Sequence, residues 1–294
     1  MRVLPALAVL ALGGAAAAWW ITGPDPLPAA TFEGLTGDPV RGETVFTAAG
    51  CASCHMAPGA EGEAELVLAG GHRFASDFGT FVAPNISPSE QGIGGWSVAD
   101  LGNALMRGVS PEGAHYYPAL PYTSYAKMQP QDVADLHAYM QTLPPSDAES
   151  QPHELGFPFS IRRTVGVWKA LYLDDAWVLE GDLTPEETRG REIVEALAHC
   201  AECHTPRNAL GAMDTARWMA GAPNPSGDGN IPGIAPGVLT WSAGEIVTYL
   251  TTGFTPEFDS VGGSMAHVVD NMAKLPDSDR QAVAAYLKRL APVE

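Results

Sequence analysis

Two short motifs in this chain combine the residue types that attach an iron porphyrin covalently. Cys51-Ala-Ser-Cys54-His55 and Cys200-Ala-Glu-Cys203-His204 each place two cysteines three positions apart, with a histidine directly after the second cysteine. Thiols at this spacing form thioether bonds with the two vinyl groups of a c-type haem, and the histidine then binds the iron from the proximal side. Because the two motifs use all four cysteines of the chain, we expect two covalently bound haem c groups.

Other uses of these cysteines fit the pattern less well. The two pairs could share one zinc ion, but that site would enclose a far longer stretch of chain than structural zinc sites usually do. Both histidines would also be left without a role. A thioredoxin-like redox pair would require alternating strands and helices around it, and the sequence does not show this alternation.

Each proximal histidine needs a second contact that fixes its ring. The other ring N–H of a metal-binding histidine commonly donates to a backbone carbonyl or a carboxylate. Prolines follow both motifs, Pro58 after His55 and Pro206 after His204. We expect the carbonyl acceptors to lie near these prolines.

The distal iron ligands are less regular than the proximal ones. A methionine thioether on that side raises the reduction potential relative to a second histidine. In the second half, Met265 follows Gly262-Gly263-Ser264 in an expected loop ahead of the last helix and is the candidate ligand. The alternative is a methionine that only fills the core.

The first half has no methionine at the position that is equivalent to Met265. The position equivalent to Met265 holds Leu120, which cannot bind iron, while Met128 lies nearby and has Leu275 as its own counterpart. We therefore expect Met128 to bind the first iron through a reshaped loop. His115, Met106 and an open coordination position are the alternatives.

Four more side chains are candidates for contacts with the haem propionates. Trp96 and Trp241 could direct their indole N–H groups toward a carboxylate while packing against the porphyrin edge. Arg73 and Arg207 carry guanidinium groups that match a carboxylate bidentately. Core aromatics and surface arginines are the plainer interpretations of these residues.

The two motifs belong to two copies of one domain. Trp96-Ser97 recurs 145 residues later as Trp241-Ser242, and three further residues recur at the same offset: Leu105 as Leu250, Gly108 as Gly253 and Pro111 as Pro256. Matches that keep their order over this length indicate a duplication. We expect domains over residues 35–145 and 184–294, joined by a linker over 146–183.

Each copy is predicted to be mostly helical. The first helices cover residues 38–49 and 184–198, and Ser97 and Ser242 are good N-caps for helices that end near residues 107 and 252. Closing helices over 132–140 and 279–290 place apolar residues on one face, which should pack on the first helix of the same copy. Within the linker, an amphipathic helix over 160–173 is expected to pack between the two domains.

The N-terminus has the composition of an export segment. After Arg2, an apolar run extends from residue 3 to residue 21, close to the roughly 20 residues that cross a bilayer as a helix. Trp19 and Trp20 end the run, as aromatic residues do at a membrane interface. We expect residues 1–22 to be a membrane anchor, or a signal peptide cleaved near Ala15 to Ala18. Both place the protein on the periplasmic side of a bacterial inner membrane.

The charge of the chain limits its partners. Thirty-four acidic and 16 basic residues give a net charge of −18, which excludes nucleic acid. An acidic surface suits a redox partner with a basic docking face, because complementary charge speeds encounter. The same acidity could serve only to keep the protein soluble.

Together these features resemble class I c-type cytochromes, twice over, and more closely the membrane-anchored dihaem cytochrome c subunits of bacterial periplasmic dehydrogenases. Besides the haem motifs, the resemblance depends on five segments: Ala83-Pro84-Asn85-Ile86, residues 92–97 (GIGGWS), 117–122 (YPALPY), 199–208 (HCAECHTPRN) and 262–265 (GGSM). It implies an all-α fold of two tandem cytochrome c domains, two six-coordinate haems, Met265 as a distal ligand, and electron transfer.

We therefore expect an electron carrier rather than an enzyme. No flavin, quinone or nicotinamide motif is visible, so a donor dehydrogenase would be a separate chain, and the acceptor would be a cytochrome, a quinone or an oxidase. The alternative is a dihaem enzyme with an open position at the first haem, either a peroxidase or a thiosulfate-oxidising cytochrome. A haem-based sensor would need an output domain, and none is visible.

Overall fold

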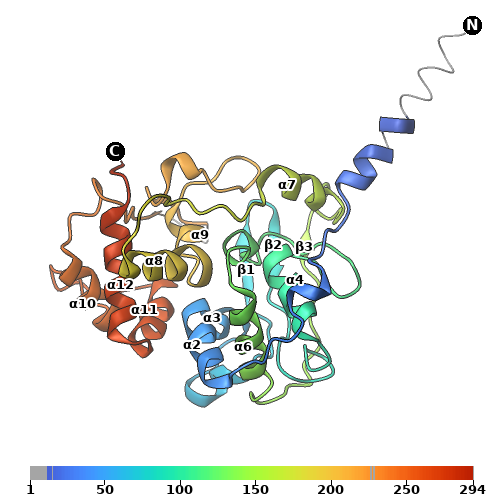
Figure 1. Cartoon of the computed structure of the whole chain (residues 1–294), viewed down its shortest axis with the longest axis horizontal. Helices are drawn as coiled ribbons and strands as arrows, with labels where there is room; N and C mark the ends of the chain where they lie inside the picture. The colour runs from blue at the N-terminus through green and yellow to red at the C-terminus, as the bar shows by residue number, and fades with distance from the viewer. Residues whose placement is uncertain (1–11, 15, 226, 228, 294) are drawn as a thin grey trace, which may run out of the picture.

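The computed structural model describes residues 12–14, 16–225, 227 and 229–293, and it contains two helical domains side by side. The first domain runs from blue to green and the second from yellow to red in Figure 1. The linker crosses from one to the other along the edge that carries helix α7. The division into two domains agrees with the internal repeat.

The first domain is built from five helices and a hairpin: α2 (Pro39–Ala49), α3 (Cys51–His55), β1 (Arg73–Ser76), β2 (Gly79–Val82), α4 (Val98–Arg107), α5 (Tyr122–Tyr125) and α6 (Pro130–Met140). The linker contains β3 (Glu154–Leu155) and α7 (Thr164–Tyr172). The second domain has α8 (Pro185–Arg191), α9 (Ala201–His204), β4 (Ala222–Pro223), β5 (Asn230–Ile231), α10 (Ala243–Thr252), α11 (Met265–Lys274) and α12 (Asp277–Arg289).

In both domains the first and last helices cross at a glycine. A Cβ on Gly42 of α2 would lie 1.9 Å from the carbonyl oxygen of Asp135 in α6. A Cβ on Gly190 of α8 would lie 2.0 Å from the carbonyl oxygen of Ala282 in α12. Because no side chain fits at either position, the helix backbones approach more closely than ridge-and-groove packing allows. The predicted contact between first and closing helices is confirmed.

An arginine–aspartate pair links the same helices. In the first domain Arg41 donates to both carboxylate oxygens of Asp135, at 2.7 and 3.0 Å. In the second domain Arg189 donates to both oxygens of Asp279, at 3.0 and 2.9 Å. Burial alone would raise the pKa of Asp135, but hydrogen bonds from Arg41 and from the Asp38 N–H hold it below its usual value. The crossing is therefore fixed by directional bonds as well as by packing.

The two serines that were expected to cap helices do so, at the starts of α4 and α10. Ser97 and Ser242 both accept a hydrogen bond from the backbone N–H three residues later, and the carboxylates of Asp100 and Glu245 accept the return bond from the cap residue. This capping box satisfies two backbone donors at each start. α4 and α10 are thus equivalent helices, as the repeat predicts.

The structure also departs from the prediction in three places. The fold is mostly helical but not all-α, because β1, β2 and β3 form an antiparallel sheet and β4 pairs with β5. The first helix of the second domain changes after Arg191 into a π-helical segment, Glu192–Leu197. Met265 does not lie in a loop; it is the first residue of α11. The sequence did not predict these strands, because they are too short to show an alternating apolar pattern and are flanked by glycine and short polar segments.

The linker helix α7 lies mainly against the first domain. Gly166 packs against the Thr22 carbonyl and the His115 ring, while Trp168 donates to the Leu210 carbonyl of the second domain at 2.9 Å. The helix therefore contacts both domains, as expected from its amphipathic pattern. It also holds the N-terminal segment, since Arg163 lies over the Trp19 ring at 4.0 Å.

The expected membrane anchor falls mostly outside the described residues, because residues 1–11 and 15 belong to it. Within the part of the chain that the structure describes, no helix combines the length and apolar character needed to cross a bilayer.

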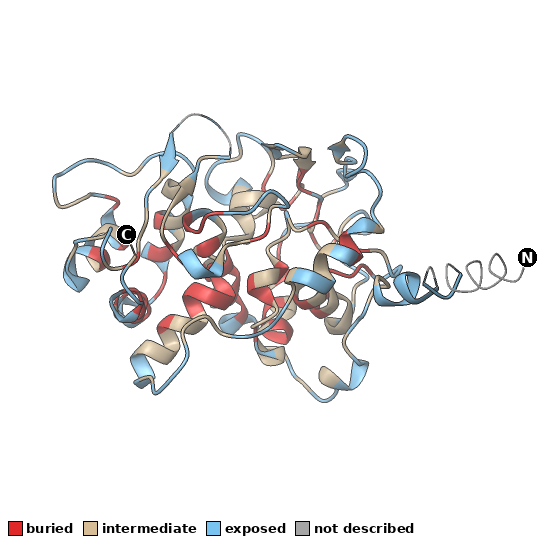
Figure 2. Ribbon diagram, turned by 90° about the horizontal axis from the view of Figure 1, so that it is seen from above, coloured by how far each residue is buried: buried red, intermediate tan, exposed pale blue. Residues whose placement is uncertain are grey.

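Buried apolar residues form one cluster that includes both domains. In Figure 2 the buried segments (red) gather toward the middle of the molecule, while exposed segments (pale blue) lie mainly around its outside. Tyr122 and Tyr286 are among the largest fully buried side chains. The two domains therefore share a packed core, and their relative position is fixed.

We predict that Gly190→Ala destabilises the haem-loaded protein by about 2–3 kcal/mol, because the new methyl group must push the backbones of α8 and α12 apart. The melting temperature should fall by roughly 5 °C or more. Gly244→Ala in α10 is the control, since a Cβ there meets no atom within 4 Å. Equal melting temperatures for the two variants would contradict the tight crossing.

Candidate haem sites

The first attachment motif forms a short helix of its own. α2 ends at Ala49 and is capped by Gly50, which adopts the left-handed conformation (φ 62°), and α3 begins at once with Cys51. The imidazole Nδ1 of His55 lies 2.9 Å from the carbonyl oxygen of Pro84. A protonated Nδ1 donates to this carbonyl, so Nε2 is the nitrogen that is left for a metal.

The second motif repeats this arrangement. Nδ1 of His204 lies 2.7 Å from the carbonyl oxygen of Pro232. Burial lowers the pKa of both His55 and His204 below the usual value, and the carbonyl contacts oppose this only in part. Each ring is therefore neutral near pH 7, which is the form that binds a metal.

The carbonyl acceptors are not where the sequence predicted them. The prolines next in sequence, Pro58 and Pro206, are not the partners; the acceptors are Pro84 and Pro232, 29 and 28 residues after the histidines. Both belong to equivalent segments, Pro-Asn-Ile and Pro-Gly-Ile. The repeated Pro-x-Ile was the signal that could have located them.

The residues of both motifs fit a covalent haem. All four cysteines are free thiols, and each histidine has one ring nitrogen committed to a carbonyl. Among the described residues, no group of three or more histidine, cysteine or acidic side chains gathers to hold a metal ion. His72, close enough to lower the pKa of His55, has a buried Nε2 without a partner in the described structure, as expected beside a group that is bound there.

The two candidate methionines lie in different settings. Met128 is 3% exposed and belongs to the core, between α5 and α6. Met265 is partly buried at the start of α11 and packs against the same core. The two candidates thus occupy non-equivalent positions: Met128 lies shortly before the closing helix α6, whereas Met265 begins α11, the helix that precedes the closing helix α12.

The rival ligands of the first domain have other roles in the structure. Nε2 of His115 lies 3.0 Å from the Thr22 carbonyl, where it helps to hold the N-terminal segment. Met106 is buried in α4 as part of the core. The contact of His115 with Thr22 does not involve the attachment motif.

The propionate candidates divide into two groups. Arg73 pairs with Glu154 of β3, and Arg207 pairs with Glu202 inside the second motif, so both arginines already have carboxylate partners. Trp96 and Trp241 are partly buried against the core. Within the described residues, Trp168 and Trp218 donate their indole N–H groups to protein acceptors, whereas no such bond is made by Trp96 or Trp241.

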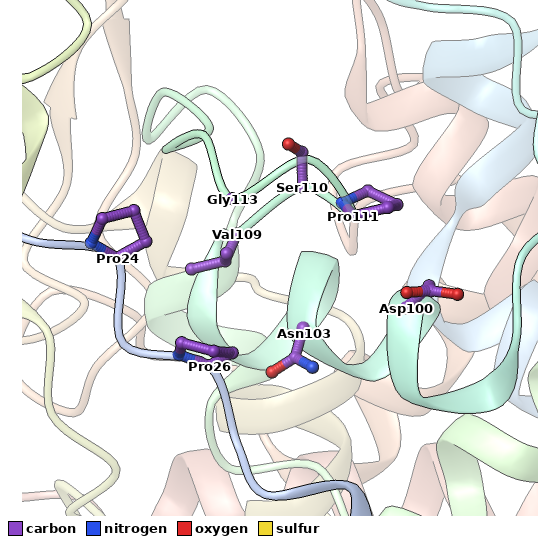
Figure 3. A pocket seen from close by; sticks show the side chains of 8 residues that line it. All are labelled: Pro24, Pro26, Asp100, Asn103, Val109, Ser110, Pro111 and Gly113. Carbon is purple, nitrogen blue, oxygen red and sulfur yellow. The ribbon is translucent and has the colours of Figure 1, made fainter.

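One cavity lies away from both motifs. It has a volume of about 390 Å³ and separates Pro24 and Pro26 of the N-terminal segment from α4 and the loop after it (Figure 3). Its lining contains Asp100 and Asn103 but no cysteine, histidine or methionine. The cavity therefore lacks the histidine, methionine and cysteine side chains that would bind a haem iron.

Sequence reasoning missed the contacts that join each motif to the opposite domain. Thr123 donates to Glu202 at 2.7 Å, and Asn271 donates to Ser53 at 3.1 Å. Ser53 and Glu202 are each one of the two residues between the cysteines of their motif, where the attachment signature allows any residue. Burial, and then the charge of Cys203, raise the pKa of Cys54 to about 11, so the thiols of the two motifs are near one another.

Comparison with known proteins agrees with this geometry. The family model for cytochrome c matches residues 39–144 and 187–291. A dihaem c-type cytochrome of Cereibacter sphaeroides is 58% identical over 294 residues, which cover 100% of this chain and 99% of that protein.

Cytochrome subunits of dehydrogenases are also similar. The fructose dehydrogenase cytochrome subunit of Gluconobacter japonicus is 38% identical over 84% of this chain, and the cytochrome c subunit of the quinone-dependent alcohol dehydrogenase of Gluconobacter oxydans is 32% identical over 86%. The chain spans about half the length of these two subunits, 51% and 55%. The chain thus belongs to the cytochrome c family, with two cytochrome c domains and two covalently bound haem c groups.

Proposed function

We propose that this protein carries single electrons from a periplasmic dehydrogenase, or another donor, to a cytochrome, a quinone or an oxidase. A bound haem c supplies an iron that alternates between the ferric and ferrous states by one electron. The observation that supports the proposal best is that each attachment motif is hydrogen-bonded to the opposite domain, because these bonds place both redox groups within one packed core. The similar dehydrogenase subunits support a dehydrogenase as the donor.

The chain would contribute attachment, ligation and burial. The thiols of Cys51 and Cys54 would hold the first haem and those of Cys200 and Cys203 the second. His55 and His204, fixed by the Pro84 and Pro232 carbonyls, would bind the irons through Nε2. Rings that are fixed in this way change little between oxidation states, which keeps the reorganisation that accompanies each transfer small.

We assign the distal positions to Met128 and Met265. Met128 lies shortly before α6 and Met265 begins α11, whereas the ring of the rival His115 packs against α7, with its Nε2 on the Thr22 carbonyl and its buried Nδ1 without a partner among the described residues. Thioether ligation at both irons would leave no position for a substrate or peroxide, which favours a carrier over a dihaem peroxidase. Trp96 and Trp241 would turn their unpaired indole N–H groups to the propionates, whereas for Arg73 and Arg207 the same role would require leaving Glu154 and Glu202.

We also propose that the protein works on the periplasmic side of the inner membrane. The Trp19 and Trp20 side chains are exposed, as an aromatic pair at a membrane interface would be. The cation–π contact of Arg163 with Trp19 would then hold the first domain close to that surface. Recovery of the protein from washed periplasmic membranes, by fractionation and immunoblotting, would test this placement.

Haem content tests the attachment sites. The Cys51→Ala/Cys54→Ala variant should lose one haem, and the Cys200→Ala/Cys203→Ala variant should lose the other, because each motif serves one domain. The pyridine haemochrome assay on purified protein should give half the wild-type haem per chain in both cases. Unchanged haem content in either variant would contradict the assignment.

Spectroscopy tests the distal ligands. Met128→Leu and Met265→Leu conserve volume and remove the thioether, so each should weaken the far-red band of the oxidised protein that reports iron–methionine bonding. The reduction potential of the affected haem should fall. Met106→Leu is the matched control and should leave the band at full strength. A loss of the band in the Met106 variant, with none in the Met128 variant, would show that the first-domain ligand is wrong.

The carrier role is tested by partners and by turnover. Co-purification from native membranes should bring down a dehydrogenase, and adding its substrate should reduce both haems with no activity from this chain alone. Robust peroxidase activity in the wild-type protein, measured with a chromogenic donor, would contradict the carrier role and favour a dihaem enzyme.

A further inference from the structure

One residue beside the second motif has a backbone conformation that its type rarely adopts. His199 directly precedes Cys200 and has φ 42°, in the left-handed region. The equivalent residue before Cys51 is Gly50, with φ 62°. A left-handed residue is thus required at this point of both domains, and glycine adopts it at least cost. The second domain nevertheless has a histidine at this position, and contacts of its side chain must offset the backbone strain.

The histidine ring reaches across to the other domain. Its Nε2 lies 3.2 Å from the carbonyl oxygen of Ala49, two residues before Cys51. The hydroxyl of Tyr125 donates to the same oxygen at 3.4 Å. The rings of Tyr125 and His199 meet edge to face, with centroids 5.7 Å apart and planes 81° apart. One carbonyl at the start of the first motif is therefore held by a residue at the start of the second.

Two further hydrogen bonds fix the same contact. Ser53, between the cysteines of the first motif, accepts from Asn271 of α11. Glu202, between the cysteines of the second motif, accepts from Thr123 of α5. The two attachment helices, α3 and α9, carry the motifs. Each of them is thus hydrogen-bonded to the opposite domain through a residue within its own motif. The contact is also packed, since Tyr125 is 5% exposed.

We propose that His199, together with Tyr125, is a positioning residue for electron exchange between the two haems. The inference rests on the proposed carrier function. In each exchange one iron passes from ferrous to ferric as the other passes from ferric to ferrous, so one electron moves and no proton or bond changes. The histidine and tyrosine rings hold the two attachment helices at a fixed separation and exclude water from the space between them. Orientation of this kind controls the rate of a transfer between fixed groups.

The test uses His199→Gly in the full-length, haem-loaded protein. Glycine adopts the required φ without strain, as Gly50 does, so haem attachment and folding should be preserved. The interdomain hydrogen bond and the ring contact are lost. Exchange between the haems, measured in half-reduced protein from exchange cross-peaks of the haem methyl signals, should slow several-fold, because the two attachment helices are no longer held at a fixed separation.

A matched variant separates strain from positioning. Phe258 also has a positive φ (67°), but its side chain is 86% exposed and lies far along the chain from both motifs. Phe258→Gly relieves comparable strain and should leave the exchange rate at the wild-type value. Equal rates in His199→Gly and wild type would overturn the inference, as would equal slowing in both glycine variants.

Tyr125 provides a second measurement. Tyr125→Phe keeps the ring and loses only a long hydrogen bond, so exchange should stay near the wild-type rate. Tyr125→Leu removes the edge-to-face contact and should slow exchange as His199→Gly does. The far-red band and both reduction potentials serve as the check on haem ligation in every variant. If the substrate-loaded donor reduces both haems while these variants keep the wild-type exchange rate, this inference fails and the carrier function stands.

Discussion

The close crossing of the first and last helices in each domain is the constraint on which the other features depend. At Gly42 and Gly190 the backbones meet without an intervening side chain, and an arginine–aspartate pair on each crossing fixes its angle. Since the attachment motif directly follows the first helix, the crossing determines where both cysteines and the histidine lie. In the first domain the closing helix α6 follows shortly after the candidate Met128, so one helix pair would position both sides of that haem. In the second domain the candidate Met265 begins α11, the helix before the closing one.

Much of this arrangement could be predicted from the sequence, because the informative residues occur twice. The Cys-x-x-Cys-His motifs, the serine caps at Ser97 and Ser242, and the glycine in each first helix all recur at nearly constant offset. A sequence pattern that is weak evidence for a helix or cap in one domain becomes strong evidence when the same pattern recurs in the other domain. The two-domain division and the helix pairs followed from this comparison, and the family comparison agrees with the haem prediction.

Other features depend on contacts between residues that are distant in the chain, and local pattern carries no information on them. The Pro84 and Pro232 carbonyls are backbone groups, so no residue type marks them as histidine partners. The bonds of Ser53 and Glu202 join opposite domains. The helix α11 was missed because Gly262-Gly263-Ser264 indicates a loop, and this loop ends where Met265 begins. The internal repeat also gives no information on how the two domains pack against each other.

The shared apolar core has a thermodynamic consequence. Because the buried cluster continues from one domain into the other, neither domain can lose its packing without exposing apolar surface of its neighbour. Ligand binding to a folded state stabilises whatever unfolds together with the binding site. Each haem therefore stabilises both domains, and the two halves of the chain unfold as a single cooperative unit.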